Sequence, residues 1–185
     1  MNVSDSLLNR STYVYFSIAV YVCAFFSFVY IGLQIDDYKH LDSTSVYAVK
    51  DSNLFGDISD YTLKGIFINN LVYIIKNYLG VITFGVYPII LLFFNASFFG
   101  LIVGRVISEH GLNFVLIHTL PHSIELIAVV LAAADSMFLG VLISLKLLRL
   151  HDERIDYYAF FKNFVLYSII ILIAAFCEAN ISMKI

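Results

Sequence analysis

Residues 80–105 read GVITFGVYPIILLFFNASFFGLIVGR, and this stretch decides the fold class of the 185-residue chain. It contains no charged side chain before Arg105, although Pro88 and Asn95 interrupt its apolar character. An α-helix needs about 20 apolar residues to cross the hydrocarbon of a bilayer. The sequence therefore predicts a transmembrane helix over these residues.

Four more apolar stretches are predicted to be spans: residues 13–35, 112–134, 137–148 and 163–181. Asp135-Ser136 is predicted to form a tight turn between two of them. Residues 65–79 are shorter and carry Asn69, Asn70, Lys76 and Asn77, so we expect an interfacial or re-entrant helix there. The predicted fold class is all-α, a polytopic transmembrane helix bundle of about five spans plus this one segment.

The composition supports a membrane protein. Hydrophobic residues make up 61% of the chain and charged residues 14%, against about 25% charged residues in soluble domains. The net charge of −3 gives no basic surface for nucleic acid. Cys23 and Cys177 both lie in apolar stretches and are expected to be buried thiols. No P-loop and no Ser-His-Asp arrangement is visible, so we expect no enzyme, no cofactor and no metal.

The chain is predicted to be one integral membrane domain. Residues 1–12 form a tail, 13–35 the first span, 36–64 an acidic loop and 65–185 the helical core. Lys146, Arg149, Arg154 and Lys162 crowd the last internal loop, and the positive-inside rule places that loop in the cytoplasm as a docking region. The Arg105 turn and the N-terminal tail are then expected in the cytoplasm. The acidic loop, the Asp135 turn and the C-terminus are expected outside.

Polar side chains inside a span are candidate functional residues, because they are costly in lipid. His118, His122 and Glu125 have i, i+4 and i+7 spacing, which places them on one helix face, and Asn95 lies at similar depth in the preceding span. Three interpretations stay open. They are an interhelical polar clamp, a wet site for a substrate or proton, and a metal site made of two imidazoles and a carboxylate.

Other residues have predicted structural roles. Pro121 is expected to kink its helix. Ala96, Gly100 and Gly104 form a small-xxx-small pattern that lets helices pack closely. Asp135 and Glu178 are expected at the outer ends of their spans, as a solvated rim or a docking point.

Several motifs occur in a familiar order. They are Asn69-Asn70-Leu71, then Asn95-Ala96 with Gly100, then Leu120-Pro121-His122-Ser123-Ile124-Glu125-Leu126, and finally Ala174-Ala175 with Glu178. Together they resemble the stage II sporulation protein M family of membrane proteins, from about residue 65 to the end. The chain departs from the family pattern at Ala96 and Ser123, where glycine is more common, and in the spacing from His122 to Glu125.

The resemblance implies two roles. The sporulation member resembles a membrane scaffold that works with peptidoglycan-remodelling enzymes. Other members occur with ABC-type ATPases in the making, export or immunity of circular bacteriocins. The first hypothesis is therefore a non-enzymatic scaffold in the cell membrane. Its expected partners are the lipid bilayer and other membrane proteins, and a homo-oligomer is compatible with this role. The alternative is a membrane subunit of an ABC-type export system, and a third hypothesis is an intramembrane metal-dependent enzyme.

Overall fold

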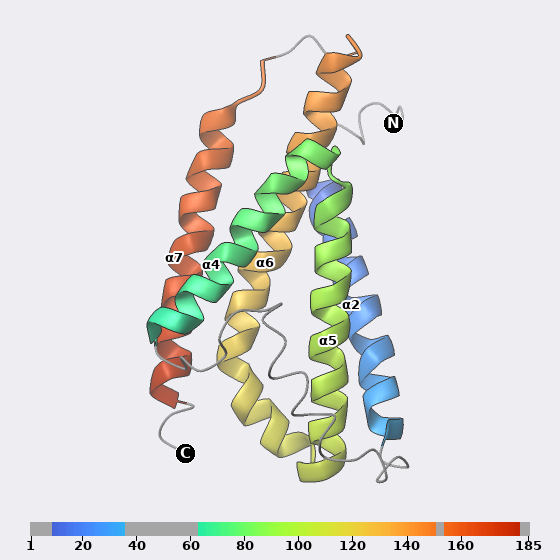
Figure 1. Cartoon of the computed structure of the whole chain (residues 1–185), viewed down its shortest axis with the longest axis vertical. Coiled ribbons are helices and arrows are strands. Elements are labelled where there is room, and N and C mark those ends of the chain that lie inside the picture. The colour runs from blue at the N-terminus through green and yellow to red at the C-terminus, as the bar shows by residue number, and fades with distance from the viewer. Residues whose placement is uncertain (1–8, 36–62, 151–153, 182–185) are drawn as a thin grey trace.

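The protein is described here by a computed structural model that covers residues 9–35, 63–150 and 154–181 (Figure 1). The described residues form α2 (Arg10–Gln34), α4 (Leu63–Leu79), the short 3-10 helix η3 (Gly80–Thr83), α5 (Val86–His110), α6 (Leu112–Leu147) and α7 (Tyr157–Ile181). This part of the chain contains no strand. Five of its helical segments are long and apolar enough to cross a membrane. The prediction of an all-α bundle is confirmed.

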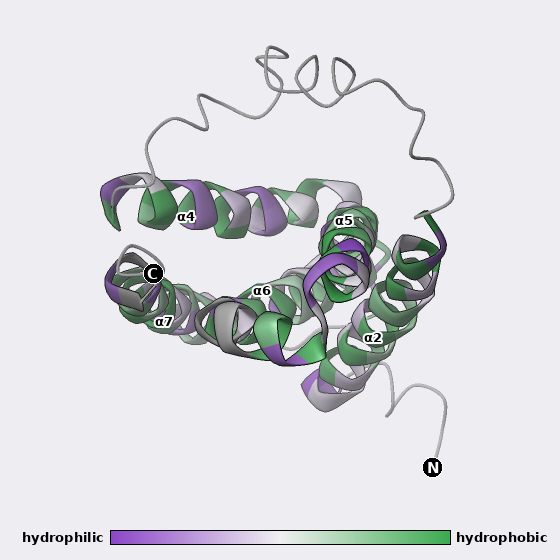
Figure 2. Cartoon of the chain, turned by 90° about the horizontal axis from the view of Figure 1, so that it is seen from below, coloured by the Kyte–Doolittle hydropathy of each residue, from purple (hydrophilic) through white to green (hydrophobic). Residues whose placement is uncertain are grey.

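Helix α6 is the centre of the bundle. It contacts α2, α4, α5 and α7, and its span is the most buried of the five (Figure 2). Val129 and Ala133 on one face pack into a cluster with α2 and α5, while Ala128 and Ala132 on another face pack with α4 and α7. Small side chains on both faces allow the neighbouring helices to approach α6 closely.

Helices α2 and α5 pack with their backbones in contact. A Cβ atom on Gly100 would lie 2.4 Å from the carbonyl oxygen of Phe25, and one on Gly104 would lie 2.3 Å from that of Val29. Gly32 of α2 makes the reciprocal approach toward α5. Only a residue without a side chain fits at these positions, so the glycines set the distance between the two helices.

The structure differs from the expectation for residues 65–79. Helix α4 continues through η3, so that Leu63–Thr83 is a 21-residue candidate span rather than an interfacial or re-entrant segment. The left-handed φ angles of Phe84 and Gly85, 54° and 88°, end this segment. The predicted span over residues 80–105 therefore starts only at Val86. Its first residues belong to the turn before it.

The predicted turn at Asp135-Ser136 was wrong. Helix α6 runs without a break from Leu112 to Leu147, 36 residues, and replaces the two predicted spans 112–134 and 137–148. Two consecutive polar residues within an apolar stretch are typical of a turn, but here both side chains bond to other helices instead of water. The total of five spans is kept, because α4 replaces the span that is lost.

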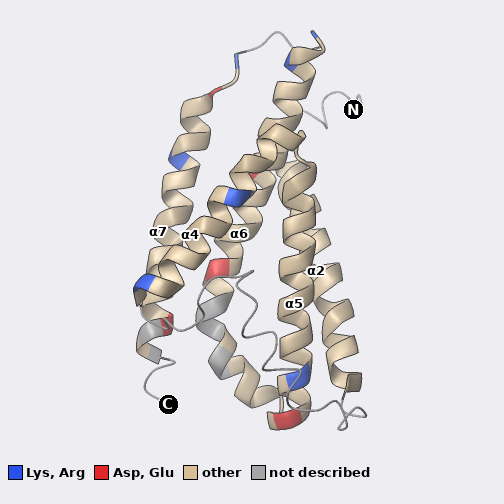
Figure 3. Ribbon diagram, viewed as in Figure 1, with Lys and Arg blue, Asp and Glu red and all other residues tan. Residues whose placement is uncertain are grey.

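The ends of the bundle also differ from the predicted topology. Since α6 has no turn, it carries the chain from the end that holds Arg105 to the end that holds Lys146 (Figure 3). The prediction that Arg105 lies on the same side as the Lys146–Lys162 loop was wrong. Helix α2 begins in the half of the bundle in which α6 ends, and α7 ends in the other half (Figure 1). Arg10 is the first residue of α2 rather than part of a tail.

We expect Gly104→Ala to destabilise the protein by about 1–3 kcal/mol, because the added methyl group meets backbone that cannot move aside. The measurement is thermal unfolding of the purified protein in detergent. Ile102→Ala, at a 44% exposed position on the same helix, is the control and should change the melting temperature much less. Equal melting temperatures for Gly104→Ala and the wild type would contradict this packing.

Candidate functional site

The best-defined polar site of the described bundle is built around Asp135 of α6. Its side chain is 0% exposed, although it lies in the middle of the candidate span Ser123–Leu147. Its carboxylate accepts hydrogen bonds from the amide of Asn163 at 2.8 Å and from the hydroxyl of Tyr167 at 2.9 Å. Asn163 and Tyr167 are one turn apart on α7, so this helix presents two donors to one carboxylate.

Arg10 supplies the countercharge from α2. Its Nε donates to the other carboxylate oxygen of Asp135, and its terminal guanidinium nitrogen donates to the Tyr167 hydroxyl at 2.8 Å. Arg10 is 44% exposed while Asp135 is fully buried, so the pair extends from the bundle surface into its interior. Three residues from three helices thus close a triangle of charge-assisted hydrogen bonds.

Helix α4 joins the same level through its backbone. The hydroxyl of Ser136, next to Asp135, donates to the carbonyl oxygen of Asn77 at 2.6 Å. The Asn77 side chain donates to the carbonyl of Tyr73 at 3.1 Å. Nearby, a Cβ on Gly80 would lie 2.2 Å from the ring of Pro88, so the turn between α4 and α5 packs tightly at this point.

This arrangement is suited to holding helices together. A buried carboxylate in a medium of low dielectric is stable as an anion only when it is paired and hydrogen-bonded. Asp135 has a cation and two neutral donors, so its lone pairs are engaged within the protein. We call Arg10, Asp135, Asn163 and Tyr167 the Asp135 clamp.

The clamp contradicts the prediction that Asp135 belongs to a solvated outer rim. The physical reason is that α6 continues past Asp135, which places this residue inside the bundle and not at the end of a span. Glu178, the other predicted rim residue, is half-buried near the end of α7. The two acidic residues therefore do not form one rim.

The predicted cluster of His118, His122, Glu125 and Asn95 is only partly described. His118, His122 and Glu125 lie on α6, and Asn95 lies on α5. The side chains of His118 and His122, and that of the neighbouring Pro121, are not among those that the structure describes. Glu125 is 2% exposed. The three interpretations of this face, which are an interhelical polar contact, a wet site and a metal site, therefore stay predictions. Among the side chains that are described, no three His, Cys, Asp or Glu come together as metal ligands.

Asn95 has a neighbour that the sequence did not indicate. Its side chain is within hydrogen-bonding reach of the Tyr73 hydroxyl, which itself donates to the Leu91 carbonyl at 2.6 Å. Asn95 therefore contributes to the contact between α4 and α5.

Helix α6 bends in its yellow part in Figure 1. Proline inside a helix is a common cause of such a bend, because it removes one backbone hydrogen bond. Pro121 lies in this half of α6.

The remaining predicted residues lie at two places. Ala96, Gly100 and Gly104 are buried on α5, where the two glycines face α2. The four basic residues Lys146, Arg149, Arg154 and Lys162 are all exposed at the end where α6 and α7 connect. Arg149 adopts a left-handed φ of 59° directly after α6 ends.

An apolar hollow of about 190 Å³ lies on the outside of α2 and α5. It is lined by Phe28, Phe93, Phe94, Ser97, Phe98 and Leu101. None of these side chains is charged, so the hollow offers no group for acid–base or metal chemistry.

Sequence reasoning missed Arg10, Asn163 and Tyr167. One signal was available: Asn163 and Tyr167 have i, i+4 spacing and face the same way, so a polar partner is expected opposite them. Arg10 could not be assigned, because its position at the start of α2 is equally typical of an interfacial anchor.

We expect Arg10→Gln to destabilise the protein by about 3 kcal/mol, because it leaves the buried Asp135 carboxylate without a cation. In the double variant, Asp135→Asn should add little to this loss, because the buried carboxylate charge that Arg10 neutralises is then absent. Thermal unfolding of both single variants and the double variant in detergent measures this coupling.

The control for this cycle is Arg105→Gln. Arg105 forms an exposed ion pair with Glu109 at 2.9 Å, and such surface pairs contribute only about 0–1 kcal/mol. Additive effects of Arg10→Gln and Asp135→Asn would contradict a direct pair.

Comparison with protein families identifies the chain. The family described as Stage II sporulation protein M matches residues 14–183, nearly the whole length. The resemblance seen from residue 65 onward is confirmed and extends through α2 as well. Comparison with curated proteins and with solved structures gave no match. With its five candidate spans, the chain is a multi-pass membrane protein that belongs to the stage II sporulation protein M family.

Proposed function

We propose that this protein is a non-enzymatic scaffold of the cell membrane, which holds partner proteins in a larger complex. The observation that carries the proposal is the Asp135 clamp. The buried charge at this level is engaged in joining α2, α6 and α7, and its carboxylate has its donors within the protein. Such a group stabilises a rigid bundle and is not poised for proton transfer or nucleophilic attack.

The orientation we propose places the start of α2 in the cytoplasm and the end of α7 outside. Lys146, Arg149 and Arg154 are exposed where α6 ends and α7 begins, as the positive-inside rule expects for the cytoplasmic side (Figure 3). Helix α2 ends and α4 begins in the opposite half of the bundle (Figure 1). The six aspartates of residues 36–62, which lie outside the described residues, would then be outside the cell, where cell-wall-remodelling partners act.

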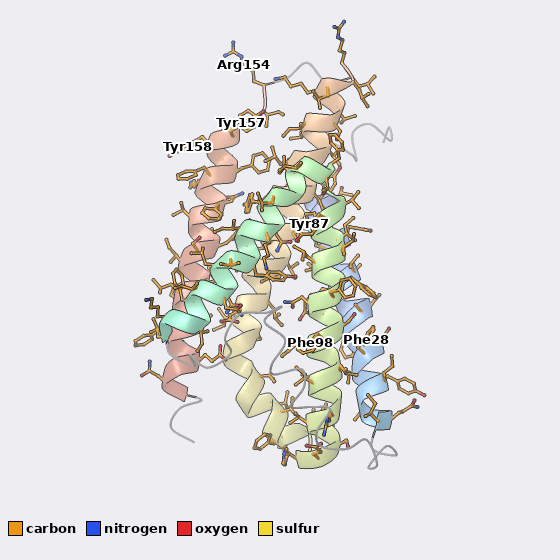
Figure 4. All side chains as sticks on the ribbon, viewed as in Figure 1. Phe28, Tyr87, Phe98, Arg154, Tyr157 and Tyr158 are labelled. Atoms are coloured by element: carbon orange, nitrogen blue, oxygen red, sulfur yellow. The ribbon has the colours of Figure 1, made fainter. Side chains whose placement is uncertain are left out.

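A membrane subunit of an ABC-type export or immunity system is the second candidate function. The observation that favours it is the exposed end formed by α6 and α7. Here Arg154, Tyr157 and Tyr158 point outward, and Tyr158 is 75% exposed (Figure 4). Leu147 and Leu150 are also exposed beside Lys146. A mixed basic and apolar surface of this kind suits a soluble partner such as an ATPase.

Labelling of single cysteines tests the orientation. In a background with Cys23→Ser and Cys177→Ser, we expect a membrane-impermeant maleimide to label Glu109→Cys in intact cells but not Leu150→Cys. Both positions are exposed: Glu109 lies in the last turn of α5, before α6 begins, and Leu150 lies just after α6 ends. After permeabilisation both should react. Labelling of Leu150→Cys alone in intact cells would reverse the proposed orientation.

Isolation of the tagged full-length chain in mild detergent, with mass spectrometry, tests the function. A scaffold should retain the same partner proteins after Lys146, Arg149, Arg154 and Lys162 are all changed to Gln, and no ATPase should be among them. Lys64→Gln with Arg105→Gln is the control at the other end of the bundle. An ATPase that is retained by the wild type and the control but lost from the quadruple variant would support the export subunit instead. Stoichiometric metal in the purified protein would support an enzyme.

A further inference from the structure

Helix α4 presents polar side chains to the outside of the bundle. Asn69 and Lys76 are seven residues apart, so they lie on one stripe of the helix, and both are exposed. Val72 lies between them and is 41% exposed. Ile68, Ile75 and Leu79 continue the same outward face. We call these six residues the α4 outer face.

The side chains of Asn69 and Lys76 form no hydrogen bond or ion pair with the described residues. On the buried side of the same helix, the amide nitrogen of Asn77 donates to the Tyr73 carbonyl. Figure 2 shows α4 at the edge of the bundle with more hydrophilic ribbon than its neighbours. Its span also has the lowest hydropathy of the five.

The depth of these residues matters for the argument. Asn69 is six residues from the start of Leu63–Thr83 and Lys76 is seven from its end, so each lies about 10 Å inside the segment. A lysine at this depth can extend its long side chain toward the interface. An asparagine cannot, because its side chain is short. Asn69 would therefore face lipid hydrocarbon with no hydrogen-bond partner, which is unfavourable.

Among the described residues of the spans, a second copy of the chain offers no acidic side chain to Lys76 at the same depth. Within the described spans, Asp135 and Glu125 are both buried. The other acidic residues there are Glu109, which is exposed in the last turn of α5, and Glu178 of α7, and both lie at a different depth from Lys76. Tyr78, two residues after Lys76, contacts Phe164 of α7 at a ring distance of 5.5 Å, whereas Glu178 lies 14 residues further along α7. That is about 21 Å along the helix.

We propose that the α4 outer face docks a transmembrane helix of a different protein, which carries a carboxylate opposite Lys76 and a hydrogen-bonding group opposite Asn69. Polar groups hold transmembrane helices together in this way, because each satisfies the other away from water. The aliphatic residues of the face supply the packing around the two polar contacts. The proposal rests on the proposed scaffold function, for which it names the intramembrane contact.

Photocrosslinking in the native cell tests this inference. A benzophenone amino acid at Val72 of the full-length chain should give one discrete adduct with another membrane protein. The same amino acid at Ile169, a 49% exposed position on the outside of α7, should give none and is the matched control. We expect Lys76→Glu to reduce the Val72 adduct at least tenfold. Lys76→Arg should keep it, and Asn69→Leu should weaken it.

The decisive result is a charge exchange. Once the crosslinked segment is identified, Lys76→Glu combined with a carboxylate-to-lysine change in that segment should restore the adduct. Because Lys76 faces outward, Lys76→Glu should leave the melting temperature unchanged, which separates loss of docking from loss of fold.

Three outcomes would overturn the inference. The first is that Val72 forms an adduct only with lipid, with the chain itself or with a second copy. The second is an adduct that survives Lys76→Glu. The third is a charge exchange that fails to restore docking. The scaffold function fails separately, when the wild-type chain retains no partner in mild detergent. Retention of the same partners by Lys76→Glu leaves the scaffold in place and removes only the α4 contact.

Discussion

A carboxylate placed in the interior of a transmembrane bundle must be paired, and the arrangement of this protein depends on how Asp135 meets that requirement. Its partners come from the first residue of α2 and from two turns of α7. Helices that are far apart in the chain are thereby fixed at one level relative to α6. The adjacent Ser136 fixes α4 at the same level through the carbonyl of Asn77. One short segment of α6 thus bonds to three other helices.

Close apolar packing between helices adds to the polar contacts that align them. In lipid, helices gain little from hydrophobic burial, since the tails are as apolar as leucine, so close contact of backbones matters more. Gly32, Gly100 and Gly104 provide that contact between α2 and α5, and the alanines of α6 provide it at the centre. The bundle therefore has a rigid middle, and its large side chains lie mostly on the outside, where lipid can solvate them.

The placement of polar groups inside and outside the bundle bears on the role of this protein. The buried Asp135 joins helices, while exposed polar and basic groups lie on α4 and at the α6–α7 end. This arrangement supports the scaffold role that we propose. The face that contains His118 and His122 stands apart from this pattern, because Glu125 beside it is buried without being part of the Asp135 clamp.

The sequence alone determined that the helices lie in lipid, that the fold is all-α, and which family the chain belongs to. Residues 80–105 carry no charge before Arg105 and are long enough to contain a transmembrane helix, and the motifs from Asn69 to Glu178 indicated the family. The small residues Gly100 and Gly104 indicated close packing, but not that α2 is the partner helix. Only the tertiary structure decided that α4 is a full candidate span and that α6 passes through Asp135 without a turn. Hydropathy measures each residue against water or lipid one at a time, so it counts an aspartate and three asparagines as signs of an exposed segment. Whether side chains such as those of Asp135 and Ser136 are instead satisfied by Arg10, Tyr167 or a backbone carbonyl depends on helices distant in the chain. The local sequence does not determine those contacts.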